Sequence, residues 1–366
     1  MTGTQTGIRH TTLPDGTPAW LVGGYDNVRA ALADPRLSLD KRNADGYKGF
    51  SLPPALDANL LNMDPPDHTR VRRLVSQAFT ARRSEALRPR VQQIADELLD
   101  AVEPLGRADL IAAYAGPLPV TVICELLGVA DDRRADFRAW TDALLGPDRS
   151  AAALAIGQLH AYFQELIAAT RERPGDDMLS ALSHGTDRLT SDELTSLAFL
   201  LLFAGYENVV NLVGTGIMTL LANPDLLDAV RAEPALLPAT VEELLRHEPP
   251  APLSIRRFPV EDVTIAGVTV PKGATVLLSL GDANRDPDRF ADPDRLDVRR
   301  DAGGHLAFGH GIHFCLGAAL ARVEAEVALG TVLRRLPSLA LAVPVADLRW
   351  RPTVRTRGLA ELPVRW

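Results

Sequence analysis

Cysteine is scarce in this chain: only Cys124 and Cys315 occur among its 366 residues. Small secreted folds are stabilised by several disulfides, so two cysteines argue against that class and fit a reducing cytosol. The N-terminus also lacks the basic patch and following apolar stretch of a signal peptide or membrane anchor. Internal repeats and low-complexity linkers are absent from the sequence as well. We therefore expect a cytoplasmic protein that is not anchored in a membrane.

An excess of positive charge is also lacking, because 47 Asp and Glu residues outnumber 39 Lys and Arg residues. The formal net charge of -8 makes nucleic acid an unexpected partner, since binding a polyanion needs an excess of Lys and Arg. Hydrophobic residues make up 46% and charged residues 23% of the chain, as in ordinary soluble globular proteins. The length suffices for a large core.

The apolar spacing along most of the chain is that of helices, and β-rich segments are few. The expected helices cover residues 25–33, 67–77, 85–102, 119–127, 132–145, 151–172, 176–183, 225–232 and 237–247. The expected strands cover residues 19–22, 260–270, 275–279, 340–344 and 359–366. Residues 40–62 lack periodicity and are expected to form a long loop. The pattern predicts a mainly α fold with a minor β portion.

One long apolar helix is predicted in the middle of the chain. Thr190 and Glu193 form a capping box in front of an apolar run, and the pattern continues to an Asn-Pro pair. The helix would have about 30 residues and a length of roughly 45 Å, enough to cross a domain. Glu207 and Asn208 interrupt the apolar run, and its uninterrupted part is too short to cross a bilayer. We expect this helix at the centre of a helical domain.

The most informative segment is Phe308-Gly-His-Gly-Ile-His-Phe-Cys-Leu-Gly317, which places one cysteine on a glycine-rich loop before a helical pattern. Backbone N–H groups and the helix dipole favour a thiolate at such a position. Glycines let the backbone approach a flat cofactor closely. A thiolate is also the axial ligand with which haem iron favours O–O cleavage. The plainer alternative is a buried, inert cysteine.

This segment resembles the haem-ligand loop of the cytochrome P-450 family, the haem-thiolate monooxygenases. The family pattern reads F-x-x-G-x-H-x-C-x-G. Its fixed places are filled here by Phe308, Gly311, His313, Cys315 and Gly317. Five fixed positions within ten residues are far more specific than a lone glycine motif, so we expect the chain to share the family's properties.

The resemblance implies a fold and a cofactor. The fold would be the cytochrome P-450 fold, a single domain of residues 1–366 with the long central helix over the haem. Residues 1–18 are expected to be disordered or to mark a shortened N-terminus. The cofactor would be haem b, iron protoporphyrin IX, with the thiolate of Cys315 as the axial metal ligand and with O2 as co-substrate.

The resemblance also implies which other side chains hold the cofactor. Haem has two propionates, and burying them requires cationic or hydrogen-bonding partners. The residues at the family's propionate positions are His68, Arg72, Arg257 and His313. The residues that would line the cofactor on the cysteine side are Phe308, Gly309 and Gly317. The alternative for a lone His or Arg is an ordinary core or surface residue.

The central helix contains Ala204-Gly-Tyr-Glu-Asn208, similar to a family segment beside the O2 site. The resemblance implies that Ala204 and Gly205 make room for O2, that Gly205 loosens the helix, and that Glu207 begins a proton relay. Asn208 stands where the family usually has threonine, and an amide is a poor proton donor. Hydroxylation through a water-assisted relay and oxidative coupling without oxygen insertion both remain open, as does an Asn208 that only packs.

Glu243 and Arg246 lie three residues apart on one predicted helix. Such a pair is usually a solvated contact of small value. In the suspected family this pair joins a downstream arginine in a buried triad behind the cysteine loop. Arg295 is the expected third member, so we expect structural support of the loop rather than a surface ion pair.

The resemblance implies a monooxygenase that oxidises a small-molecule substrate in bacterial secondary metabolism. Electrons would come from a ferredoxin and a ferredoxin reductase, docking on the cysteine side near Arg73 and Arg322; neither nucleic acid nor membrane is an expected partner. An oxidative coupling or cyclisation enzyme and a non-catalytic haem sensor remain as alternatives. Possible polar anchors for the substrate, whose identity the sequence does not determine, are Asn59, Asn62 and Ser254.

Overall fold

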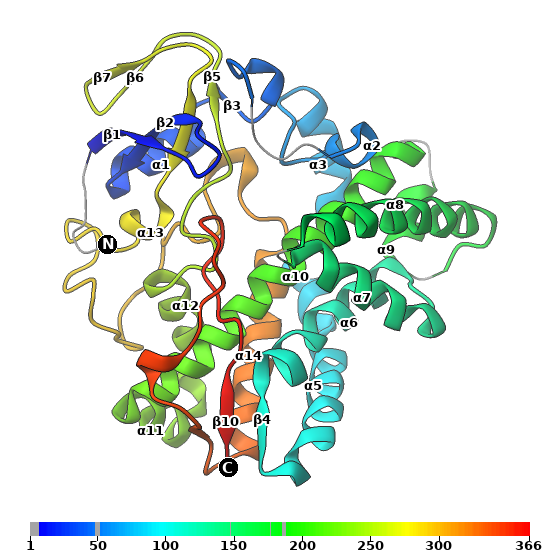
Figure 1. Ribbon diagram of the computed structural model, residues 1–366, viewed down its shortest axis with the longest axis vertical. Coiled ribbons are helices and arrows are strands. Elements are labelled where there is room, and N and C mark those ends of the chain that lie inside the picture. The colour runs from blue at the N-terminus through cyan, green and yellow to red at the C-terminus, as the bar shows by residue number, and fades with distance from the viewer. Residues whose placement is uncertain (1–6, 48–51, 147, 176, 185–187) are drawn as a thin grey trace.

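The computed structural model describes residues 7–47, 52–146, 148–175, 177–184 and 188–366 (Figure 1). Helices dominate the fold, as the sequence predicts. They are α1 (Tyr25–Ala33), α2 (Pro54–Asp57), α3 (Asp67–Ser76), α4 (Ala81–Ala86), α5 (Arg88–Val102), α6 (Pro117–Leu127), α7 (Arg134–Leu145), α8 (Arg149–Glu172), α9 (Met178–Ser183), α10 (Ser191–Ala222), α11 (Pro224–Ala232), α12 (Leu237–His247), α13 (Leu280–Ala283) and α14 (Ala318–Arg335).

The strands form small sheets at the edges of the helical body. One sheet has the order β1-β2-β8 and another β4-β10-β9, while β3 pairs with β5 and β6 pairs with β7. Only the β2–β8 pair is parallel among the described strands. The strands are β1 (Gly7–Thr12), β2 (Pro18–Gly23), β3 (Leu37–Ser38), β4 (Arg107–Asp109), β5 (Phe258–Pro259), β6 (Val263–Ile265), β7 (Val268–Val270), β8 (Thr275–Leu278), β9 (Ala340–Leu341) and β10 (Pro363–Arg365).

The expectation of disorder over residues 1–18 is wrong for the part that the structure describes. Strand β1 pairs antiparallel with β2 from Gly7 opposite Gly23 to Thr12 opposite Pro18. The side chains of this strand are polar, but its backbone groups are satisfied by the ladder, which polarity does not reveal. Residues 1–6 lie outside the described residues.

Two other expectations need correction. The helix predicted over 85–102 is divided into α4 and α5, and Pro89 lies in the first turn of α5. Proline favours the start of a helix because it lacks the N–H that would go unbonded there. The region 40–62, predicted as a loop, contains the short helix α2. The predicted helix at 176–183 begins at Met178, and residue 176 itself lies outside the described residues.

Helix α10 forms the centre of the molecule and runs diagonally through it in Figure 1. The capping box is present: Glu193 N–H donates to Thr190 Oγ1 (3.2 Å), and Thr190 N–H donates to Glu193 Oε2 (2.8 Å). The helix is long and apolar enough to cross a membrane, but 72% of its apolar window is buried inside the protein. It is therefore a core helix, as predicted.

The largest hydrophobic core gathers around α10. Helices α2, α6, α8 and α14 all pack directly against it, and α5 packs on α14. A second, smaller core lies between α1 and the sheet of β2 and β8, with Val28, Val276 and Leu278 fully buried. Because α14 follows the cysteine loop and packs on α10, the two predicted parts of the site are joined by the main core.

Replacing Thr190 with Ala tests the cap of α10. The N–H of Glu193 would lose its acceptor, and loss of an N-cap side chain costs about 1 kcal/mol. We expect the free energy of unfolding, measured by urea denaturation, to fall by that amount, while Thr190→Ser retains most of it. Equal stability of the Ala variant and the wild type would show that the capping box contributes nothing.

Candidate active site

The loop before Cys315 is shaped by backbone conformations that only glycine adopts readily. Gly309 and Gly311 have φ angles of 74° and 77°, in the left-handed region. A Cβ on Gly311 would also lie 3.2 Å from backbone atoms of α1. The N–H of Cys315 donates to the carbonyl of Phe308 at 2.8 Å, which closes the loop. Gly317 then caps α14. The glycines are needed for the turn itself, in addition to any close approach of a cofactor.

The thiol of Cys315 is half-buried, whereas Cys124 is buried. Burial raises the pKa of the Cys315 thiol, while the backbone N–H of Gly317 and the charges of Arg72 and Arg322 lower it. The expected preference for thiolate therefore does not come from the loop and helix alone. A bound metal cation deprotonates a coordinating thiol outright, so a metal partner would make this thiol a stable thiolate.

The four expected propionate-binding residues lie together, and some of their buried nitrogens have no hydrogen-bond partner in the described structure. Burial, and then the charges of His68, Arg257 and Arg72, lower the pKa of His313 to about 3. The rings of His68 and His313 have centroids 4.2 Å apart. Both ring nitrogens of His68 and Nε of Arg257 are buried without a hydrogen-bond partner in the described structure. Burial also lowers the pKa of Arg257 to about 10.

Buried hydrogen-bonding groups of this kind are nearly always paired in proteins. An anionic group that bound among them would provide the missing partners. Arg72 adds a donor on the same side, since its Nη2 lies 2.6 Å from the carbonyl oxygen of Phe314. A thiol beside two arginines and two histidines, among which buried nitrogens have no hydrogen-bond partner in the described structure, fits a haem with its two propionates. The residues present therefore fit this cofactor.

The structure places Ala204, Gly205, Glu207 and Asn208 within α10, which is a regular helix throughout. The expected loosening at Gly205 is absent. Its missing side chain instead leaves room for Ile123 of α6, whose Cδ1 would lie 3.3 Å from an added Cβ. This contact explains a glycine at this position by helix packing.

Asn208 uses its amide within the helix. Its Nδ2 donates to the carbonyl of Ala204 at 2.9 Å. Its Oδ1 is buried and has no hydrogen-bond partner in the described structure. One N–H of its amide is engaged in this way, so Asn208 offers one further N–H and an acceptor oxygen to its surroundings.

Glu207 is buried and is bound to the C-terminal turn around residues 353–358. Its Oε2 pairs with Nη2 of Arg355, and its Oε1 accepts the hydroxyl of Thr356 at 2.9 Å. The guanidinium of Arg355 also lies 4.5 Å from the ring centre of Phe203. Sequence reasoning missed both partners, which lie 148 and 149 residues further on. An arginine in a polar turn carries no local signal that it reaches a buried acid.

The C-terminal turn follows one face of α10. Phe203, Glu207 and Asn211 recur every four residues, so they lie on the same side of the helix. Gly358 packs so closely on Asn211 that an added Cβ would lie 1.8 Å from its Oδ1. The turn is further held by the N–H of Arg357, which donates to the carbonyl of Pro250 at 2.7 Å. The predicted relay acid is therefore tied to the C-terminal turn.

The buried triad behind the cysteine loop is present with a different third arginine. Glu243 and Arg246 are both fully buried, and Arg246 Nε lies 2.7 Å from Glu243 Oε2. Arg300, rather than Arg295, approaches Glu243, at 3.4 Å from Nε to Oε1. Arg295 contributes only its backbone carbonyl to Arg246. The two arginines lie in the same polar loop, and only its packing decides which guanidinium points inward.

The three polar anchors expected for the substrate are occupied within the chain. Asn59 donates to the carbonyl of Leu56 at 3.0 Å and accepts the N–H of Leu61 at 3.0 Å. The amide of Asn62 donates to the backbone and side chain of Asp57. The hydroxyl of Ser254 bonds to backbone groups of Ile255 and Leu278. These side chains shape their own loops and are not assigned to the substrate.

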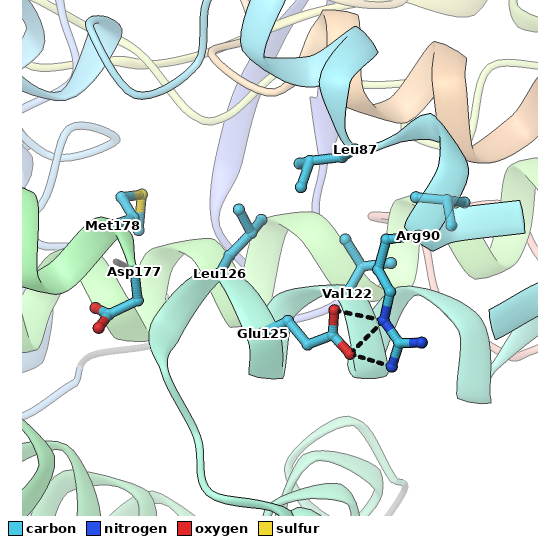
Figure 2. Close-up of a pocket in the computed structure, with 8 residues that line it drawn as sticks. Leu87, Arg90, Val122, Glu125, Leu126, Asp177 and Met178 are labelled. Carbon is cyan, nitrogen blue, oxygen red and sulfur yellow. Dashed lines mark hydrogen bonds and ion pairs between the residues drawn. The ribbon is translucent and has the colours of Figure 1, made fainter. Parts of the chain in front are cut away.

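A separate cavity of about 280 Å³ lies among α5, α6 and the start of α9 (Figure 2). Arg90 and Glu125, which line it, form a bidentate ion pair with distances of 2.6 to 3.0 Å. None of its lining residues comes from α10 or the cysteine loop. Since its arginine is already paired, this cavity shows no chemistry that would make it part of the site.

Comparison with known proteins gives matches over nearly the whole chain. The family model described as Cytochrome P450 matches residues 122–339. Cytochrome P450 monooxygenase PikC of Streptomyces venezuelae is 52% identical over 360 residues, which are 96% of this chain and 86% of that protein. The 6-deoxyerythronolide B hydroxylase of Saccharopolyspora erythraea is 47% identical over an alignment of 367 positions, which covers 96% of this chain and 91% of that protein. The solved structure of the ligand-free P450 monooxygenase TamI has a TM-score of 0.90 at 46% identity and covers 99% of this chain and 88% of that chain.

Two matched arginine variants test the triad. Arg300→Gln would leave Glu243 with one fewer partner in a buried site, and breaking a buried pair costs about 3 kcal/mol. Arg295→Gln removes an exposed guanidinium and should change the free energy of unfolding by no more than about 0.5 kcal/mol. Denaturant unfolding of both variants measures the difference. A larger loss for Arg295→Gln than for Arg300→Gln would restore the original assignment.

Proposed function

This chain belongs to the cytochrome P450 family and is a haem-dependent monooxygenase, and we propose that Cys315 is the ligand of its iron. The haem, bound through a cysteine thiolate, supplies the activation of O2. The observation that carries the assignment of Cys315 is the cluster of His68, Arg257 and His313 beside the cysteine loop, in which buried nitrogens of His68 and Arg257 have no hydrogen-bond partner in the described structure. These residues, with Arg72, would hold the propionates.

We assign the remaining loop residues to the cofactor as well. Phe308, Gly309 and Gly317 would line the haem on the cysteine side. Phe308 and Leu316, like Phe203 of α10, pack against the main core. The loop and α10 would then face each other across the cofactor, and we treat the whole chain as one catalytic domain.

The substrate class follows from the relatives and from the helix that would face it. Similar proteins include a hydroxylase named for 6-deoxyerythronolide B and a P450 named for polyketide biosynthesis. Leu200 and Phe203 present apolar side chains on α10, and Phe199 stacks on Phe203 with ring centres 6.0 Å apart. We assign to this enzyme the oxidation of a polyketide or macrolide product of bacterial secondary metabolism.

Proton delivery is assigned to Glu207, with Ala204, Gly205 and Asn208 forming the adjoining wall. Asn208 is a poorer proton source than the threonine it replaces, because an amide is a poor proton donor and one of its N–H groups is already bonded to Ala204. The hydroxyl nearest to Glu207 in the described structure is that of Thr356, which donates to Oε1. This hydroxyl can pass its proton to the carboxylate as it takes up another from solvent, so we assign Thr356 to the supply of protons to Glu207.

We still expect the electrons to come from a ferredoxin and its reductase. We also expect the enzyme to work in the cytoplasm. Ile312 of the cysteine loop is 53% exposed and is available at the surface there. Arg322 is not assigned to docking, since its guanidinium pairs with Glu242. The relatives compared above are named as enzymes, so the alternative of a haem sensor without turnover is not adopted.

Spectroscopy of the reduced protein under carbon monoxide tests the iron ligand. We expect wild-type protein to show the red-displaced absorption of a thiolate-bound haem, and Cys315→Ser to lose it because serine provides no thiolate. Cys124→Ser is the matched control and should retain the band, since that cysteine is buried and its pKa is raised to about 12 by burial. A band that survives in Cys315→Ser would refute the assignment.

Labelled O2 distinguishes hydroxylation from oxidative coupling, the second candidate that Asn208 motivates. We expect one labelled oxygen atom in the product of the wild-type enzyme, detected by mass spectrometry. Asn208→Thr would provide a hydroxyl beside Glu207 and should lower peroxide release per electron consumed, by about two-fold or more if proton delivery contributes even 0.5 kcal/mol. A product without label speaks for coupling, and unchanged peroxide release would exclude residue 208 from proton delivery.

A further inference from the structure

Two neighbouring glutamates of α12 have different partners. Glu243 belongs to the buried triad, whereas Glu242 accepts from the cysteine side of the protein. Arg322 of α14 donates from Nε to Oε1 of Glu242 at 2.6 Å and from Nη2 to Oε2 at 2.9 Å. His305 lies 3.2 Å from the same Oε2 through its Nε2. One carboxylate therefore connects α12, the first turn of α14 and the start of the cysteine loop.

The histidine contact fixes the backbone that leads to the cysteine. Nδ1 of His305 accepts the N–H of Ala307 at 3.2 Å, so Nε2 carries the proton and donates to Glu242. His305 is buried. Phe308, which follows Ala307, accepts the N–H of Cys315 through its backbone carbonyl. The hydrogen bonds thus run from Glu242 through His305 to the residues that hold Cys315 in place.

The arginine contact concerns charge. Arg322 lies with its guanidinium 4.6 Å from the ring centre of Phe308. It is one of the charges that lower the pKa of the Cys315 thiol. Burial by itself would raise the pKa of Glu242, but hydrogen bonds from His305 and Arg322 lower it to about 2. At neutral pH the Glu242 carboxylate is ionised. Its negative charge balances the positive charge of Arg322, the cation of α14 that is nearest in sequence to the cysteine loop.

We propose that Glu242 is a positioning residue of the cysteine loop. It orients His305 and neutralises Arg322, and in this way it sets the electrostatic potential at Cys315 and the reduction potential of iron bound there. This inference rests on the proposed function, since it requires haem on Cys315. Neither the triad nor the propionate cluster includes Glu242.

The sign of each effect follows from charge balance. Reduction adds an electron, so a nearby uncompensated cation favours the reduced state and an uncompensated anion disfavours it. Glu242→Gln leaves Arg322 without its counter-charge and should shift the potential in the positive direction. Arg322→Gln leaves the Glu242 carboxylate uncompensated and should shift it in the negative direction. The double variant removes both charges and should lie close to wild type.

The experiment is a redox titration of haem-loaded wild type, both single variants and the double variant, followed by absorption. The carbon monoxide band of each protein shows whether the thiolate ligand is intact. Matched controls are Glu233→Gln and Arg299→Gln, because Arg299 and Glu233 form an exposed pair at 2.8 Å. We expect the control variants to keep the wild-type potential, since exposed pairs are screened by solvent.

Opposite shifts in the single variants and their cancellation in the double variant support the proposal. Shifts of the same sign, or none, overturn it, and so does a larger shift in the double variant. An absent thiolate band in wild type would instead refute the haem assignment itself, so the two failures are distinguishable.

Hydrogen exchange gives a second readout if a charge-removing variant fails to hold haem. Measured in the haem-free protein, the amides of residues 305–308 should exchange faster in Glu242→Leu than in wild type, because His305 loses its acceptor. Glu233→Gln should leave them unchanged. Equal protection of these amides in Glu242→Leu and wild type would contradict the positioning role.

Discussion

The cysteine side of this enzyme is organised by charges that are buried and must be compensated. Glu243 faces Arg246 and Arg300, and the adjacent Glu242 faces His305 and Arg322. An ion withdrawn from water costs several kcal/mol unless a partner of opposite charge meets it. Because α12 provides both carboxylates, the loop that contains Arg300 and the cysteine loop can each adopt few arrangements around this helix. The cysteine loop therefore owes its position to a helix some seventy residues earlier as much as to its own glycines.

Around His68, Arg257 and His313 the polypeptide does not itself provide a partner for every buried polar group in the described structure. Their burial lowers the pKa of Arg257 and His313, and several of their nitrogens have no partner in the described structure. A ligand that binds only the folded state stabilises that state by mass action. Haem would complete the charge balance here, so cofactor binding and stability of this region are expected to be linked. The protein's electrostatics thus point to the cofactor independently of the cysteine motif.

Two faces of helix α10 have different contacts. Ala204 and Asn208 share one hydrogen bond within the helix, while Phe203 and Glu207 contact the C-terminal turn. The acid assigned to proton delivery is consequently coupled to a turn that also borders the expected substrate pocket. This arrangement explains how a chain without the usual threonine at position 208 can still present a hydroxyl, that of Thr356, to the acid.

The sequence by itself determined the features that depend on neighbours along the chain. These are the capping box of α10, the bounds of α12 at 237–247, and the glycine turn before Cys315. Tertiary structure alone decided which arginine meets Glu243 and that Glu207 is bound by a residue 148 positions away. Helix periods, caps and turns are short-range and leave a readable pattern. The partner of a buried charge is selected by packing in three dimensions, and many exposed-looking arginines in the sequence satisfy the same local pattern.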